Sequence, residues 1–198
     1  MYNSSNFITL KICTAWILLW IFLVLFAYPG HGRTIQEDEC VMKSVFLGKF
    51  IRYIKWPEKA GMNDRTKPFV IGILGESQLG ALIDKLYSGE KVENKKIEIR
   101  YVSTLREIYG CHILFIPSSL EKILDRIVKI TRNEPILTVG DTSGFAEQGV
   151  LINFYIAENK LRFEINEPAI RHASLKVDSL LLEVARIVKP SRESREGN

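Results

Sequence analysis

The stretch from Asp141 to Asn166 constrains the fold of this chain more than any other. It begins with a loop that contains Gly144 and Gly149 and continues into two segments in which apolar and polar residues alternate. A period of two over this length predicts a half-buried β-hairpin. Asn159, in the turn expected at residues 157–160, tolerates the left-handed backbone of a tight reversal. One hairpin face is apolar, and the other carries residues too polar to be buried one at a time: Asn153, Arg162, Glu164 and Asn166.

Upstream of the hairpin, short apolar segments alternate with amphipathic ones. We expect strands at residues 69–74, 97–102, 111–116 and 136–139, with a helix at 78–87 after the first strand and another helix after the third. Short apolar strands separated by helices are typical of parallel crossover connections. The sequence therefore predicts an α/β fold with a layered, Rossmann-like sheet of about six strands. The sheet is expected to be largely parallel, with an antiparallel C-terminal hairpin and flanking helices.

Two further helices are expected at the ends of this domain. The first spans residues 39–55, and Pro57 ends it because the residue before a proline is pushed out of helical geometry. The last spans residues 178–188 and has Asp178 as its N-cap. The predicted core faces of the two helices are Met42, Val45, Phe46, Phe50, Tyr53 and Ile54 in the first, and Leu181, Val184 and Val188 in the last.

The amino terminus carries an export signal. Residues 12–28 contain no charged side chain, Lys11 precedes them, and Gly30-His31-Gly32 offers a small-x-small cleavage site. We expect a signal peptide at residues 1–32, with an uncleaved anchor as the alternative, because the apolar span is long enough to cross a bilayer. Both options place an α/β domain at residues 33–189 outside the cytoplasm. Residues 190–198 are too polar to fold and are expected to form a disordered tail.

The charge pattern disfavours a nucleic-acid partner. The chain has 27 basic and 23 acidic residues, a formal net charge of +4. A nucleic-acid binder is expected to gather its basic residues on one face, whereas these residues are spread along the chain. Lys95 and Lys96 are better interpreted as part of a solvated surface.

Catalytic motifs are absent from the sequence. It has no dinucleotide fingerprint, H-E-x-x-H, C-x-x-C or G-x-S-x-G, and only His112 and His172 follow the export signal. We therefore expect no metal site and no cofactor. The run Asp141 to Gly144 has only a faint likeness to an aspartic-protease loop. A hydrolase using Asp141, Ser143 or His172 is a distant alternative to a binding or regulatory module that is not an enzyme.

Two cysteines remain in the exported part, Cys40 and Cys111. In an oxidising compartment they can form a disulfide, provided that their α-carbons lie close enough. The alternative is two free, mostly buried thiols.

The hairpin sequence GFAEQGVLINFYIAENKLRFEIN closely resembles the signature of the YfiR family of exported bacterial proteins. Other landmarks agree in order, so the similarity covers roughly residues 41–188. They are Tyr53 to Pro57 (YIKWP), Val70 to Gly75 (VIGILG), Gly110 to Ile116 (GCHILFI), Pro135 to Asp141 (PILTVGD) and Leu181 to Val188 (LLEVARIV).

The resemblance implies a periplasmic regulator without known catalysis. In the best-understood type, the protein represses a membrane-bound diguanylate cyclase by binding its periplasmic sensor portion, and an outer-membrane lipoprotein relieves the repression by sequestering the protein. Such a protein links the cell envelope to cyclic di-GMP and biofilm formation. The alternative is a periplasmic module that binds a small ligand and serves a different receptor, such as a histidine kinase.

The resemblance also implies specific residues. A groove for a small aromatic ligand would be formed by Lys55, Glu164, Asn166, Ile170 and Lys176. Lysine stands at two of these positions where the family leads us to expect arginine, so ligand choice can differ. The chain keeps Cys111 but has Ile71-Gly72 where a partner cysteine is expected.

Two aromatic residues at the end of the first helix are further candidates. Tyr53 and Trp56 would serve a partner or a homodimer if they are exposed, and they would otherwise pack back on the sheet.

Overall fold

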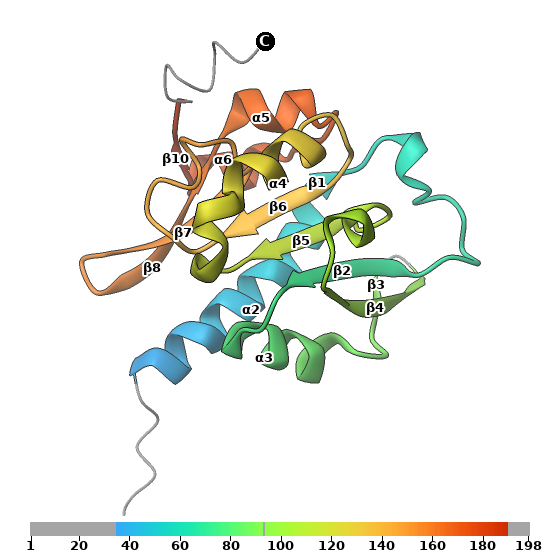
Figure 1. The fold of residues 1–198 in the computed structure, drawn as a ribbon, viewed down its shortest axis with the longest axis horizontal. Coiled ribbons are helices and arrows are strands. Elements are labelled where there is room, and N and C mark those ends of the chain that lie inside the picture. Colours follow the sequence, from blue (N-terminus) through green and yellow to red (C-terminus); the bar gives the residue numbers. More distant parts are fainter. Residues whose placement is uncertain (1–34, 93, 190–198) are drawn as a thin grey trace, which may run out of the picture. The chain divides into compact units, whose positions relative to one another are not determined.

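The computed structural model describes residues 35–189 with the exception of residue 93 (Figure 1). The predicted signal at 1–32 and the predicted tail at 190–198 lie outside the described residues. The described helices include none that is both long enough and apolar enough to cross a membrane. In chain order the elements are α2 (Ile35–Tyr53), β1 (Ile54–Lys55), η1 (Glu58–Ala60), β2 (Phe69–Leu74), α3 (Gln78–Tyr87), β3 (Lys91–Val92), β4 (Lys95–Val102), η2 (Leu105–Ile108), β5 (Ile113–Ile116), η3 (Ser118–Ile123), α4 (Leu124–Thr131), β6 (Leu137–Gly140), β7 (Ile152–Ala157), β8 (Lys160–Ile165), α5 (Glu167–His172), β9 (Lys176–Val177), α6 (Ser179–Glu183) and β10 (Arg186–Ile187).

The domain is built on an eight-stranded sheet in the order β10-β8-β7-β6-β5-β2-β4-β3. The run from β4 through β2, β5 and β6 to β7 is parallel, and Figure 1 shows β2, β5 and β6 side by side. The β7–β8 pair is antiparallel, and β10 runs parallel to β8. A separate two-stranded antiparallel sheet joins β1 to β9. The predicted fold class is therefore confirmed, and the extra strands are two-residue segments too short to show a period.

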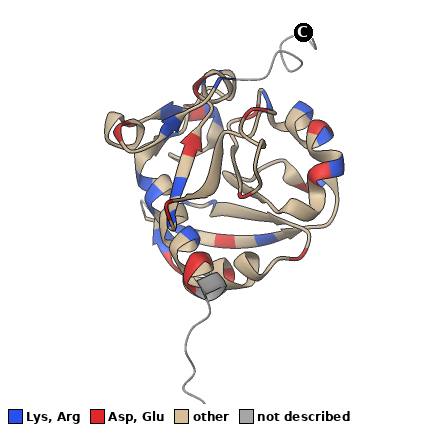
Figure 2. Cartoon of the chain, turned by 90° about the vertical axis from the view of Figure 1, so that its left-hand side faces the viewer, with Lys and Arg blue, Asp and Glu red and all other residues tan. Residues whose placement is uncertain are grey.

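Helices cover both faces of the large sheet. Leu47 and Phe50 of α2, together with residues of α3, α5 and α6, pack on one face and form the α2-side core. Leu124 and Ile127 of α4 pack on the other face and form the α4-side core. Strand β2 is buried on both faces, as expected for a central parallel strand. Basic and acidic residues are interspersed along the elements that face the viewer in Figure 2.

Helix α2 differs from its prediction at both ends, since it begins at Ile35 rather than at Glu39, and in its buried face. Leu47 and Ile51 are buried, whereas Met42 and Val45 are 47% and 44% exposed. The helix carries apolar residues on more than one side, so spacing alone could not select the face that meets the sheet. The helix ends at Tyr53, because Ile54 and Lys55 pair with β9 instead.

The hairpin forms as expected. Ala157 pairs with Lys160, so the reversal occupies only Glu158 and Asn159 and is tighter than predicted. Both residues have positive φ, 51° and 56°, which confirms the left-handed backbone expected at Asn159. This geometry matches the twist of the flanking strands.

The C-terminal helix is shorter than predicted. Asp178 caps it as expected, because its Oδ1 accepts a hydrogen bond from the Leu180 N–H at 3.0 Å. The helix nevertheless ends at Glu183, and Val184 is 65% exposed. Arg186 and Ile187 leave the helix to pair with β8. The helix predicted at residues 184–188 and the inward position of Val184 were therefore wrong, because pairing with a distant strand cannot be seen in local spacing. Val188 is buried, as predicted.

Candidate functional site

The polar face of the hairpin is buried and held by hydrogen bonds, except at Arg162, which is exposed. Glu164 is 1% exposed and Asn153 is 0% exposed. The Asn153 Nδ2 donates to Glu164 Oε1 at 3.0 Å, and the guanidinium of Arg186 donates to Glu164 Oε2 through both Nε, at 3.0 Å, and a terminal nitrogen. A buried carboxylate requires such partners because the loss of its hydration is costly.

Arg186 completes this arrangement from the last strand. Its hydrogen bonds to Glu164 raise the pKa of its guanidinium, and the guanidinium carbon lies 4.1 Å from the ring centroid of Tyr155. Sequence reasoning missed Arg186, because the residue was assigned to a helix and nothing local marks it as the partner of Glu164. The parallel register of β10 and β8 places the two residues side by side.

The loop at residues 141–149 is tied to the hairpin by two side-chain amides. The Asn153 Nδ2 also donates to the Thr142 carbonyl at 2.9 Å, and the Asn166 Nδ2 donates to the Ala146 carbonyl at 2.7 Å. The Asn166 Oδ1 accepts from the Ala169 N–H at 2.9 Å and caps α5. We call Asn153, Glu164, Asn166 and Arg186 the hairpin cluster; its contacts explain why the GFAEQG loop and the FEIN strand occur together.

The structure does not gather the five predicted ligand residues in one groove. Phe163 and Ile165 face the α2-side core, so strand alternation places Glu164 on the opposite face of the sheet. Ile170 is 3% exposed and belongs to the α2-side core. Lys55 and Lys176 are exposed and lie directly opposite each other on β1 and β9. A ligand role for these residues therefore stays a prediction. Of the five residues, only the two lysines are exposed to a ligand in solution.

The two candidate partner residues lie at the junction of α2 and β1. Trp56 is half-buried, its ring meets Phe69 edge-on at 5.3 Å between centroids, and its Nε1 donates to the His112 carbonyl at 3.3 Å. Tyr53 is also half-buried, and its carbonyl accepts from the Asp178 N–H at 2.9 Å. Both residues contact the domain and keep part of their surface in solvent. Their partner role stays a prediction.

The two cysteines of the described domain are free thiols. Cys40 packs against the α2-side core, and Cys111 is buried in the α4-side core, so the sheet lies between them. The Cys40–Cys111 bridge does not form in this structure for that reason. Gly72 makes room for the Cys111 sulfur, because a β-carbon at Gly72 would lie 2.7 Å from it.

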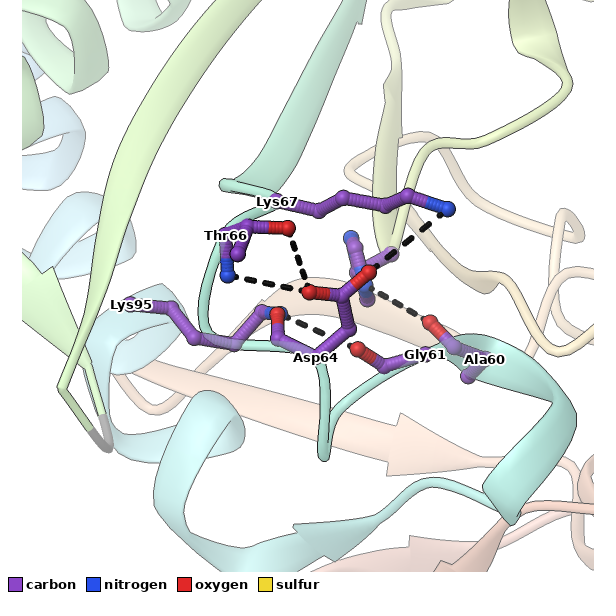
Figure 3. Close-up of polar contacts among 7 residues, drawn as sticks. Ala60, Gly61, Asp64, Thr66, Lys67 and Lys95 are labelled. Atoms are coloured by element: carbon purple, nitrogen blue, oxygen red, sulfur yellow. Dashed lines mark hydrogen bonds and ion pairs between the residues drawn. The ribbon is translucent and has the colours of Figure 1, made fainter.

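A second buried polar cluster lies where the loop at residues 58–68 meets the starts of β4 and β5. The imidazole of His112 accepts a hydrogen bond from the Val70 N–H at its Nδ1, 3.0 Å away, and its Nε2 donates to the Ala60 carbonyl at 3.1 Å. Lys95 is 0% exposed, and its Nζ donates to the carbonyls of Gly61, at 3.0 Å, and Asp64 (Figure 3). The solvated-surface prediction was therefore wrong for Lys95. We call His112 and Lys95 with these carbonyls the loop cluster.

The loop cluster is not built for nucleophilic catalysis. Burial lowers the pKa of His112 to about 4 and raises the pKa of the adjacent Cys111 to about 11. At neutral pH the pair is thus an imidazole and a thiol, whereas a reactive cysteine needs a lowered pKa. Both nitrogens of His112 are already engaged by backbone groups.

The three residues considered for a hydrolase, Asp141, Ser143 and His172, do not form a catalytic arrangement either. Asp141 accepts from the Lys43 Nζ at 2.9 Å, and Lys43 also pairs with Glu39 at 2.7 Å. Ser143 and His172 are exposed. Within residues 38–189, apart from residue 93, no group of three or more histidine, cysteine or acidic side chains could hold a metal ion.

A family model described as YfiR/HmsC-like matches residues 41–186, well over half of the chain. The chain belongs to the YfiR/HmsC-like family. Members of this family are periplasmic regulators of diguanylate cyclase signalling and are not known enzymes. A comparison with curated proteins finds no match.

Solved structures similar to this YfiR/HmsC-like chain are distant. A conserved domain protein from Vibrio cholerae O1 biovar El Tor is 7% identical over 66% of this chain and 58% of that chain, with a TM-score of 0.47. An ABC domain from Streptococcus pneumoniae in complex with L-Trp is 11% identical over 61% of this chain and 56% of that chain, with a TM-score of 0.46. This chain thus spans less than two thirds of the length of either protein, and neither likeness carries an argument about function.

Proposed function

We propose that this protein acts in the periplasm, where it binds the sensor portion of a membrane diguanylate cyclase and holds the cyclase in its inactive state. The observation that carries the proposal is the family match over residues 41–186. A supporting observation is that the side-chain donors of the hairpin and loop clusters form internal hydrogen bonds and do not line a reactive centre. Residues 1–32 would export the protein, and an outer-membrane lipoprotein that captures it would release the cyclase.

The surface we assign to this contact is the β1–β9 corner, defined as Tyr53, Lys55, Trp56 and Lys176. Lys55 and Lys176 are directly opposed in an antiparallel pair, so their side chains lie on the same face. Like charges in this position are destabilising unless an anion lies between them. The half-buried rings of Tyr53 and Trp56 add the aromatic character that is enriched at interfaces. The corner therefore suits an acidic segment of the sensor.

Binding of the purified exported protein to the periplasmic sensor portions of membrane diguanylate cyclases from the same organism tests this proposal. We expect surface plasmon resonance to show saturable binding that the double substitution Lys55→Glu and Lys176→Glu weakens about tenfold or more. Lys96→Glu with Lys160→Glu is the matched control, because it makes the same charge change at exposed strand lysines outside the corner. Equal weakening by the control would reject the corner, and no binding by the wild-type protein would reject the proposed contact.

A second function rests on the same lysine pair. A small aromatic amino acid could place its carboxylate between Lys55 and Lys176, and the protein would then be a ligand-binding module for a different receptor. Calorimetry with L-tryptophan and with tryptamine, which lacks the carboxylate, separates the two functions. Binding of tryptophan alone, abolished by Lys55→Glu, supports the module. Equal heats from the two compounds count against it.

A further inference from the structure

A cleft between α2, α3 and β3 has no role in the function proposed above. Its volume is about 390 Å³, and it includes Val45, Lys49 and Arg52 of α2, Leu86 of α3, and Lys91 and Val92 of β3. Sites for small organic molecules occupy roughly 300–1,000 Å³. None of the residues that line this cleft belongs to the β1–β9 corner, the hairpin cluster or the loop cluster.

One wall of the cleft is fixed by a close approach between α2 and α3. The Tyr87 hydroxyl donates to the Ser44 carbonyl at 2.7 Å. A β-carbon at Gly48 would lie 2.4 Å from that hydroxyl oxygen, so glycine lets the tyrosine lie against the helix. Burial raises the pKa of Tyr87, which therefore stays a neutral hydrogen-bond donor at neutral pH. The wall is consequently preformed in the free protein.

The cleft combines apolar surface with unneutralised positive charge. Val45 and Leu86 are 44% and 42% exposed, and the buried Ile97 also lines the cleft. Lys49, Arg52 and Lys91 face a single acidic lining residue, Glu90. Among the residues that the structure describes, none of these three cations forms an ion pair; Lys49 instead lies 5.3 Å above the Phe46 ring.

We propose that this cleft binds a small amphipathic carboxylate. Its apolar body would lie against Val45 and Leu86, where it covers side chains that are otherwise exposed to water. Its carboxylate would lie among the cations of α2 and β3, where charge-assisted hydrogen bonds are the strong ones. The alternation of apolar and cationic side chains around one concave site disfavours a neutral or cationic ligand.

Decanoate is a suitable probe because it joins a flexible apolar chain to one carboxylate. Titration of the purified exported protein is expected to give saturable heat at one site. Decyltrimethylammonium, which has the same chain and the opposite charge, is expected to give none. Equal binding of the two compounds, or no saturable binding of decanoate, would overturn the proposal.

Substitutions locate the site. Lys49→Glu with Arg52→Glu should weaken decanoate binding about tenfold or more. The matched control is Lys122→Glu with Arg126→Glu, which makes the same charge change at exposed positions of η3 and α4, and it should leave binding within about twofold. Leu86→Trp should also weaken binding, because it fills the apolar part and leaves the charges in place. Circular dichroism and thermal unfolding show whether each variant is folded.

The test is independent of the cyclase proposal. Lys55→Glu with Lys176→Glu should weaken sensor binding as described above and leave decanoate binding unchanged. If the variants of the cleft bind decanoate as tightly as the wild type, the carboxylate site is wrong, whatever the sensor experiment shows.

Discussion

The hairpin cluster and the loop cluster both use polar side chains to hold a loop against the sheet, but their chemistry differs. Each ties an irregular loop to the ends of strands, and each is buried apart from Arg186. The hairpin cluster uses a buried carboxylate, Glu164, paired with the half-exposed Arg186 and an amide. The loop cluster uses a neutral imidazole and a lysine that donates only to backbone carbonyls. The first depends on a charge pair, whereas the second depends on the protonation state of one ring.

The comparison also shows that a cluster can hold the fold together without being conspicuous in the sequence. The hairpin cluster lies in a stretch whose alternation and glycines are conspicuous, while no local pattern marks His112 or Lys95 as members of a buried polar cluster. Both clusters fix loops that border the β1–β9 corner or the hairpin end. The predictions below test whether they contribute as differently as their chemistry indicates.

The largest expected effect is at Glu164. Glu164→Ala removes a buried carboxylate and leaves the amide of Asn153 and the guanidinium of Arg186 without their partner, so we expect a loss of about 3–4 kcal/mol in the free energy of unfolding. Urea denaturation measures it. Arg162→Ala is the control on the same face of the same strand, and because Arg162 is exposed it should cost less than about 0.5 kcal/mol. Similar small losses for both variants would show that the hairpin cluster does not stabilise the fold.

The next effect is a pH dependence that belongs to the loop cluster. The pKa of His112 is about 4 in the folded protein, below its ordinary value of 6.5, so the unfolded state binds more protons between these values. The contribution of the neutral ring is therefore fully present above about pH 6.5 and is lost as the pH falls through about 4, with a total of about 3 kcal/mol.

Chemical denaturation between pH 4 and pH 7 checks this dependence. His112→Gln should flatten the profile over that range, although the variant is less stable at neutral pH because one backbone partner is lost. Asn166→Ala should lower the stability and leave the slope in place, since Asn166 carries no titratable group. A wild-type profile that is flat from pH 4 to 7 would contradict the role assigned to His112.

A smaller effect is expected at Lys95. Lys95→Met keeps the apolar stem and removes the donor to the Gly61 and Asp64 carbonyls, so we expect a loss of about 2 kcal/mol. The loss should be local, and amide hydrogen exchange should accelerate in residues 58–68 more than in the hairpin. Lys96→Met, at an exposed neighbouring position, is the control and should change neither quantity. Uniform acceleration across the domain would refute a local role.

The smallest effect compares two helix caps. Asn166→Ala removes the cap of α5 and the hydrogen bond to the Ala146 carbonyl, whereas Asp178→Ala removes the cap of α6 alone. We expect about 2 kcal/mol for the first and about 1 kcal/mol for the second. Thermal unfolding of both variants measures the difference. Equal losses would mean that the tie to the loop contributes nothing beyond capping.

Much of the fold was predictable because its signals are local. Strand β2 and helix α3 occupy the predicted residues, and the backbone at Asn159 and the cap at Asp178 are confirmed. The missed elements depend on distant partners. β1 and β9 pair across more than half of the chain, and β10 exists only because β8 offers it an edge.

The candidate site was less predictable than the fold. Sequence reasoning selected Glu164 and Asn166 as residues that matter, but it could not show that Arg186 neutralises the first or that both face inward. Lys95 was misjudged because a lysine in a charged connection is normally solvated, and only the folded loop supplies carbonyls to hold it. Contacts between residues distant in the sequence decide whether a charged side chain is buried. Neither the composition nor the spacing of apolar residues shows those contacts.

The most direct test of the regulatory account is the cellular level of cyclic di-GMP. Deleting the gene should raise that level. Re-expression of the exported protein should restore it, whereas a version without residues 1–32 should not, because the sensor portion lies in the periplasm. An unchanged level after deletion would contradict the account.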